Sequence, residues 1–124
     1  HIIQNVSDVK DAKVLVMGAT FKENVSDIRN SKVADVVKEL KSFSLNVDVT
    51  DPHAKSHELE HEYGFGLVPN IASDYDAVII TVPHSKYKGL DEKYFKAISK
   101  DKAVIVDLKG IYRNKISQRA YWSL

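Results

Sequence analysis

The chain has 124 residues, enough for one domain with a single hydrophobic core. Its 18 basic and 17 acidic residues are interspersed, which excludes nucleic-acid or membrane-surface binding driven by charge alone. The absence of cysteine excludes disulfides, thiolate metal sites and a cysteine nucleophile within this chain. The longest apolar run is far shorter than the roughly 20 residues of a membrane span, so a cytoplasmic protein is expected.

Short apolar runs separated by segments of helical period indicate strands that alternate with helices over a mostly parallel sheet. The first strand is expected over residues 13–18. An amphipathic helix over about residues 31–43 follows, because apolar side chains recur there at i, i+3, i+4 and i+7: Val33, Val36, Val37 and Leu40. Apolar and polar residues then alternate in a second strand over residues 45–50, which Asp51 and Pro52 end.

The second half of the chain continues the alternation of elements. A helix, two strands, a helix and a strand are expected in that order, over residues 54–63, 65–68, 77–82, 91–100 and 103–106. Gly64 is the expected terminator of the first of these helices. The aromatic tail, residues 119–124, is expected to pack back onto the body.

These elements predict an α/β, Rossmann-like three-layer domain with a mostly parallel sheet of about five strands in the order 3-2-1-4-5. Ligands of such sheets lie beyond the carboxyl ends of the strands, where the strand order reverses between strands 1 and 4. Three loops should therefore lie side by side at that edge, over residues 19–30, 83–88 and 107–113.

The loop after the first strand lacks the glycines of a dinucleotide-binding turn or a P-loop, and its helix is delayed by about a dozen residues. It offers instead an aromatic ring at Phe21 and cations at Lys22 and Arg29. A ring can stack on a base, and both cations can bind phosphate. The alternative is that Phe21 fills the core while the charged side chains pair with neighbouring acids.

Other candidates follow later strands. Lys109 would point a cation toward the same edge, or else be an ordinary solvent-facing lysine. His84 could donate to a phosphate or ribose, or pack within its own loop. His53, His57 and His61 recur every four residues and would align on one helix face, where they could chelate zinc. Their very polar surroundings favour a solvated face, and we assign no metal site.

Three stretches, GATFKENVSDIRNSK, VDVTDPH and VDLKGIY, together resemble the C-terminal, UDP-binding domain of the UDP-glucose/GDP-mannose dehydrogenase family. The resemblance covers nearly the whole chain and extends to bacterial UDP-N-acetylhexosamine 6-dehydrogenases. It implies that residues 1–124 form one domain of a longer enzyme. An N-terminal domain would bind NAD, and a central helical region would make a homodimer or higher oligomer.

Carried over by motif, the resemblance implies that Phe21 and Lys22 contact the nucleotide sugar and that Arg29 reaches the NAD. Lys109 would line the substrate pocket, although Gly110 departs from the basic residue that relatives can carry next to it. No membrane or nucleic-acid partner is implied.

The family reaction transfers two hydrides from the sugar C6 to two NAD molecules, through an aldehyde and a cysteine thioester, and yields a uronic acid for polysaccharide biosynthesis. Because this chain has no cysteine, we expect it to be inactive alone. The alternative is a free-standing Rossmann-like module that binds another nucleotide and has no dehydrogenase activity.

Overall fold

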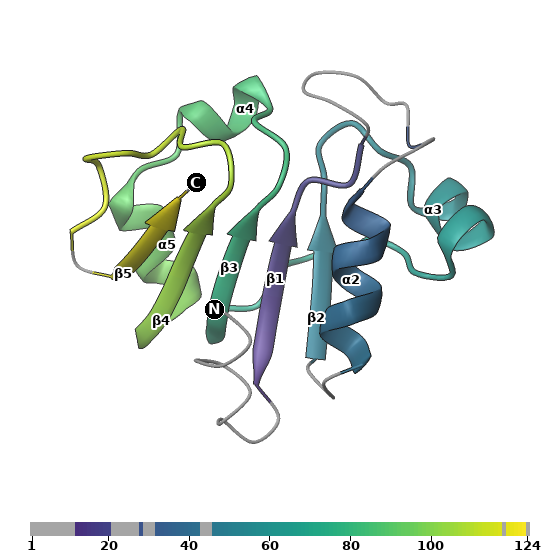
Figure 1. Ribbon diagram of the computed structural model, residues 1–124, viewed down its shortest axis with the longest axis horizontal. Helices are drawn as coiled ribbons and strands as arrows, with labels where there is room; N and C mark the ends of the chain where they lie inside the picture. Colours follow the sequence, from purple (N-terminus) through teal and green to yellow (C-terminus); the bar gives the residue numbers. More distant parts are fainter. Residues whose placement is uncertain (1–11, 21–27, 29–31, 43–45, 118, 124) are drawn as a thin grey trace.

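Five strands form one parallel sheet in the computed structural model, which describes residues 12–20, 28, 32–42, 46–117 and 119–123 (Figure 1). The sheet order is β2-β1-β3-β4-β5. The strands are β1 (Lys13–Met17), β2 (Asn46–Thr50), β3 (Tyr75–Ile80), β4 (Ser99–Asp107) and β5 (Ala120–Ser123). The helices are α2 (Val33–Ser42), α3 (Ser56–Tyr63), α4 (Ser85–Lys88) and α5 (Glu92–Ile98).

Strand β1 shows why the central strands read as continuous apolar runs. Val14 and Val16 belong to a core that α2 and α3 cover, whereas Leu15 and Met17 belong to a second core beneath α4 and α5. All four side chains are buried, and each stabilises the fold by about 1.5–3 kcal/mol relative to exposure. Helices therefore cover both faces of the sheet, and the predicted three-layer α/β class is confirmed.

The helices follow the sequence pattern closely. Val33, Val37 and Leu40 are the buried residues of α2, which confirms its predicted apolar face. Helix α3 ends at Gly64, whose left-handed φ of 82° places its N–H against the Glu60 carbonyl at 3.1 Å. Within the described residues no helix has the length and apolar content that crossing a membrane requires.

The predicted strand over residues 65–68 is wrong, and so is the outer position it was given in the order 3-2-1-4-5. The Val68 N–H bonds to the Val49 carbonyl of β2 at 2.9 Å, while the Leu67 N–H donates to the Ser56 hydroxyl of α3 at 2.9 Å. Because this short segment bonds in part to the helix before it, it adds no strand to the sheet, and β2 remains an edge strand.

The fifth strand is the C-terminal tail. Strand β5 pairs parallel with β4, with Tyr121 opposite Ile105 and Trp122 opposite Val106. The expectation that the tail packs onto the body is confirmed, and β5 supplies the edge opposite β2.

Two tyrosines within strands, Tyr75 in β3 and Tyr121 in β5, should make the stability of the fold fall at alkaline pH. The pKa of Tyr121 is raised to about 12, mainly by burial and next by its hydrogen bond to Asp107. The pKa of Tyr75 is also raised to about 12, mainly by burial, and its hydroxyl donates to Asp48 at 2.7 Å. A raised folded-state pKa means that this stabilisation is complete below about pH 10, the unfolded value, and is lost as the pH rises toward 12. We expect the free energy of unfolding, measured in urea, to fall across that window, and to fall less steeply in Tyr121→Phe. A free energy that stays level from pH 9 to 12 would contradict this.

Candidate ligand-binding edge of the sheet

The carboxyl ends of β1, β2 and β3 bring three polar side chains together. Thr20 follows β1, Asp51 follows β2 and His84 follows β3. The Thr20 Oγ1 lies 3.2 Å from the His84 Nε2, which in turn lies 2.9 Å from the Asp51 Oδ2. The structure thus confirms that the loops after β1 and β3 meet where the strand order reverses.

Asp51 is the centre of this cluster. Its Oδ2 accepts the Ala19 N–H at 2.7 Å as well as the His84 Nε2, and its Oδ1 accepts the N–H groups of His53 and Ala54 at 2.7 and 2.8 Å. The side chains of Asp51 and His84 are both 0% exposed. Because a carboxylate only accepts, the His84 Nε2 is the donor. Four hydrogen-bond donors therefore compensate the Asp51 carboxylate for its loss of hydration on burial.

Gly18 is required by packing against β3. Its φ is 114°, and its carbonyl accepts the Thr81 hydroxyl at 2.8 Å. A Cβ at this position would lie 2.8 Å from the Thr81 Oγ1 and 2.8 Å from the Val82 Cβ. This glycine lets two strand ends approach each other, and α2 begins only at Val33. Without a helix N-terminus directly behind the turn, this connection does not fit the pyrophosphate of NAD.

The end of β4 contains a second buried carboxylate. The Asp107 Oδ2 accepts the Tyr112 N–H at 2.7 Å and the Tyr121 hydroxyl at 2.6 Å, while its Oδ1 has no hydrogen-bond partner among the described residues. Lys109 lies exposed in the turn that follows, beside Gly110 with a φ of 69°. The predicted position of Lys109, on a loop at the carboxyl edge, is confirmed, and its role remains a prediction.

Phe21, Lys22 and Arg29 lie outside the described residues. Their described neighbours are Thr20, held in the cluster above, and Ile28, whose carbonyl accepts the Tyr63 hydroxyl at 2.5 Å. Sequence reasoning missed both Asp51 and Tyr63 as partners of this segment. Asp51 had a signal, since an acid at the end of a parallel strand reaches the ligand edge; Tyr63 had none.

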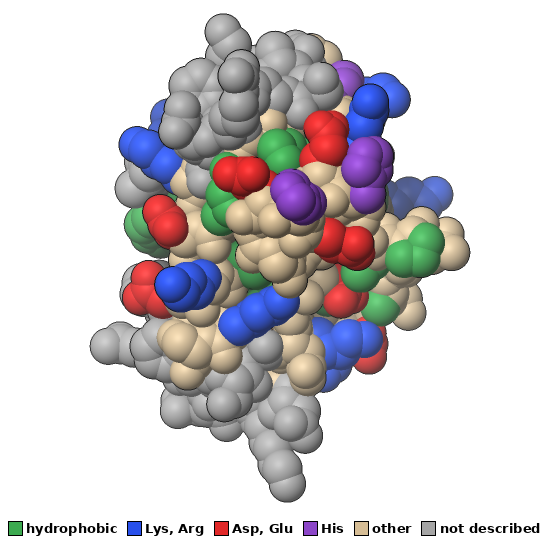
Figure 2. All heavy atoms as spheres, turned by 90° about the vertical axis from the view of Figure 1, so that its right-hand side faces the viewer, with side chains coloured by type: hydrophobic (Ala, Val, Ile, Leu, Met, Phe, Trp, Pro, Cys, Tyr) green, Lys and Arg blue, Asp and Glu red, His purple; other side chains and the backbone are tan. Residues whose placement is uncertain are grey.

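The histidine ladder does not form as predicted. Helix α3 begins at Ser56, so His53 precedes it, and the His53 ring packs edge-on against His84 with 4.7 Å between centroids. His57 and His61 line a shallow hollow of about 290 Å³. Figure 2 shows histidine, acidic and basic side chains mixed on this side. In the part of the chain that the structure describes, no three potential metal ligands come together.

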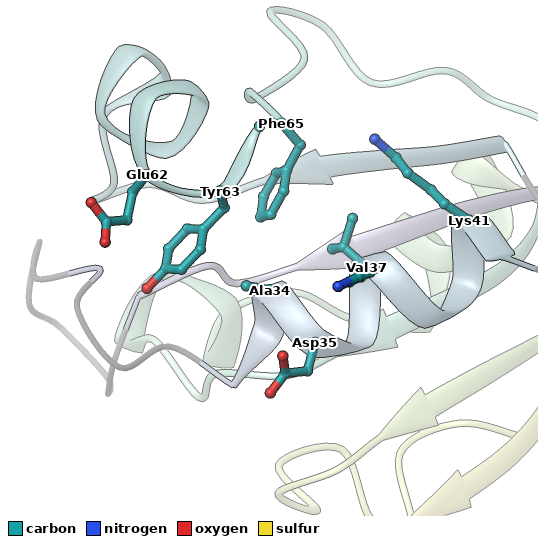
Figure 3. A pocket seen from close by; sticks show the side chains of 9 residues that line it. Ala34, Asp35, Val37, Lys41, Glu62, Tyr63 and Phe65 are labelled. Carbon is teal, nitrogen blue, oxygen red and sulfur yellow. The ribbon is translucent and has the colours of Figure 1, made fainter.

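A larger groove of about 690 Å³ lies between α2 and the end of α3 (Figure 3). Its apolar lining includes Ala34, Val37 and two aromatic residues, Tyr63 and Phe65, whose rings stack with 6.1 Å between centroids. Tyr63 therefore has two roles: its ring lines the groove, and its hydroxyl donates to the Ile28 carbonyl.

Comparison with known proteins decides the family. A family model described as the UDP-glucose/GDP-mannose dehydrogenase family, UDP binding domain, matches residues 15–114. The chain belongs to the UDP-glucose/GDP-mannose dehydrogenase family. The matched residues run from within β1 to the turn after β4.

Relatives of this UDP-binding domain are much longer. It is 41% identical over 111 residues to a UDP-N-acetyl-D-glucosamine 6-dehydrogenase of Salmonella typhi, covering 89% of this chain and 26% of that protein. A protein of the same name from Pseudomonas aeruginosa is 41% identical over 102 residues, covering 82% and 24%. The UDP-binding domain thus spans about a quarter of the length of these relatives.

A solved structure shares the fold. The UDP-N-acetyl-mannosamine dehydrogenase Cap5O of Staphylococcus aureus superposes with a TM-score of 0.75 at 27% identity, covering 97% of the UDP-binding domain and 27% of the Cap5O chain. The similarity extends across β1 to β5, so the parallel sheet and its order are those of a dehydrogenase domain.

Proposed function

We propose that the chain is the C-terminal, nucleotide-sugar-binding domain of an NAD-dependent dehydrogenase that oxidises C6 of a UDP-N-acetylhexosamine, or of a UDP-hexose, to a uronic acid in the cytoplasm. The observation that carries the proposal is 41% identity to two proteins named UDP-N-acetyl-D-glucosamine 6-dehydrogenase. The rest of the enzyme, including the dimer-forming region, would come from parts of the polypeptide beyond this chain.

The proposed ligand contacts are those of the carboxyl edge. Phe21 would contact the nucleotide sugar through its ring, and Lys22 and Lys109 would neutralise phosphate charge. Support comes from the position of Lys109, which follows β4 at the carboxyl edge of the sheet. Thr20, the residue directly before Phe21, lies at the same edge beside His84. Arg29 would reach the NAD, which is held elsewhere because the turn at Gly18 does not fit it.

The chemistry divides between this domain and the rest of the enzyme. Bound NAD supplies the hydride acceptor, and a cysteine outside this chain supplies the thiol, since no cysteine is present here. The task of this domain is to bind the UDP moiety and orient the sugar. A charged hydrogen bond from Lys22 would retain the substrate while both oxidations take place.

The test is Lys22→Ala in the full-length dehydrogenase that carries this chain, assayed with UDP-N-acetylglucosamine and NAD. We expect kcat/KM for the UDP-sugar to fall about 30-fold, the equivalent of about 2 kcal/mol for a lost charged hydrogen bond. Lys102→Ala, at an exposed lysine within β4, is the matched control and should leave kcat/KM unchanged. The isolated chain should form no NADH. Equal kcat/KM values for Lys22→Ala and the parent enzyme would contradict the proposal.

A further inference from the structure

Helix α3 presents two histidines to solvent, one helical turn apart. Leu59 is fully buried and marks the side of α3 that packs on the core, and His57 and His61 lie two positions before and after it. At about 100° per residue, both histidines lie on nearly the opposite side of the helix, and both are exposed. Although His53 lies outside the helix, the remaining pair therefore keeps the spacing that the sequence predicted.

The spacing of this pair allows both imidazoles to reach one metal ion. Side chains four positions apart on a helix stand one above the other, with their Cβ atoms about 5–6 Å apart, and an imidazole nitrogen binds a metal at about 2 Å. His57 and His61 line the same hollow of about 290 Å³. Neither imidazole has a hydrogen-bond or ion-pair partner among the described residues, so no such contact has to break when a metal binds.

The charge of α3 favours a cation at the histidine pair. The helix contains three glutamates and no lysine or arginine, and two of the glutamates, Glu58 and Glu62, line the same hollow as the histidines. Figure 2 shows acidic side chains beside histidines on this side of the molecule. Carboxylates alone would suit Mg²⁺ or Ca²⁺, whereas imidazoles prefer Zn²⁺, Ni²⁺ or Cu²⁺. Two imidazoles within a negatively charged surface therefore indicate a divalent transition metal.

We propose that His57 and His61 form a surface site for one divalent transition-metal ion of the class that imidazole prefers. In the part of the chain that the structure describes, no third protein ligand joins the pair, so water completes the coordination sphere. The site uses none of the residues of the Asp51 cluster. It is independent of the proposed dehydrogenase function, and its test needs no substrate.

The test is Ni²⁺ binding to the full-length protein that carries this chain, purified without a polyhistidine tag and measured by isothermal titration calorimetry. His57→Ala and His61→Ala should each weaken one Ni²⁺ site per protomer by at least about tenfold, because the second imidazole acts at a high effective concentration once the first has bound. The same site should bind Cu²⁺ more tightly than Ni²⁺ or Zn²⁺. Excess Mg²⁺ should leave Ni²⁺ bound, since Mg²⁺ prefers oxygen ligands.

A spacing variant is the matched control for chelation. Combining His61→Glu with Glu62→His keeps the composition and charge of α3 but places the second imidazole five positions from His57, about 140° around the helix. This variant should bind Ni²⁺ as weakly as His61→Ala. All these changes are at exposed positions, so the far-UV circular dichroism should match that of the parent protein. Equal Ni²⁺ affinity in the parent and the spacing variant, or displacement of Ni²⁺ by Mg²⁺, would overturn the proposed site.

Discussion

Asp51→Ala is expected to lower the free energy of unfolding by about 3–5 kcal/mol, because it leaves several buried hydrogen-bond donors without their acceptor. The substitution leaves the buried His84 and the Ala19 N–H without their acceptor, together with the N–H groups of His53 and Ala54. The measurement is urea denaturation followed by far-UV circular dichroism.

Two variants make this result specific. Asp51→Asn keeps the shape but turns an amide nitrogen toward N–H donors, so we expect an intermediate loss of about 1–3 kcal/mol. Asp101→Ala removes an exposed aspartate that lies 3.7 Å from Arg119, and such a surface pair contributes at most about 1 kcal/mol. If Asp51→Ala and Asp101→Ala unfold at the same urea concentration, the Asp51 cluster does not stabilise the fold as its geometry indicates.

Gly18→Ala should be the second most damaging change, at about 2–5 kcal/mol. A positive φ costs a residue with a Cβ about 1–2 kcal/mol, and forcing a methyl group into packed atoms costs about 1–3 kcal/mol more. Here the new Cβ would lie 2.8 Å from Thr81 and Val82 atoms at the start of the β3–α4 connection. Because β3 is a central strand, the neighbouring backbone can move little to relieve the contact.

Two other glycines separate the contributions to that loss. Gly64 has a φ of 82° but open space where a Cβ would lie, so Gly64→Ala should lose only the conformational part, about 1–2 kcal/mol. Gly89 has a φ of −84° and open space, so Gly89→Ala should stabilise by about 0.4–1 kcal/mol. Thermal unfolding of the three variants should rank them in that order. Equal melting temperatures for Gly18→Ala and Gly64→Ala would contradict the prediction, because they would show that Thr81 and Val82 move aside at little cost in free energy.

The central sheet could be predicted from the sequence because its signals are local and strong. Buried parallel strands covered on both faces read as apolar runs, and β1, β3 and β4 all show this pattern. The outer strands depend on competition between segments. Residues 65–68 have strand composition but bond in part to Ser56 of α3, whereas the tail pairs with β4 as the outermost strand.

The candidate site was predictable in location but only in part in composition. Strand order alone places the ends of β1 and β3 side by side, and this put Thr20 and His84 at the ligand edge. The contact from Tyr63 to Ile28 spans 35 positions and joins a helix end to a connection, so no periodicity or spacing encodes it. Such contacts depend on how far α3 stands from the sheet, which is set by packing rather than by local pattern.

The placement of Trp122 on the outermost strand has a practical consequence. It is the only tryptophan of the chain and is 36% exposed, so its fluorescence reports on one sheet edge while circular dichroism reports on the whole molecule. Detachment of β5 would redden the emission before the helices melt. The two optical signals together would therefore distinguish fraying at the C-terminus from cooperative loss of the domain.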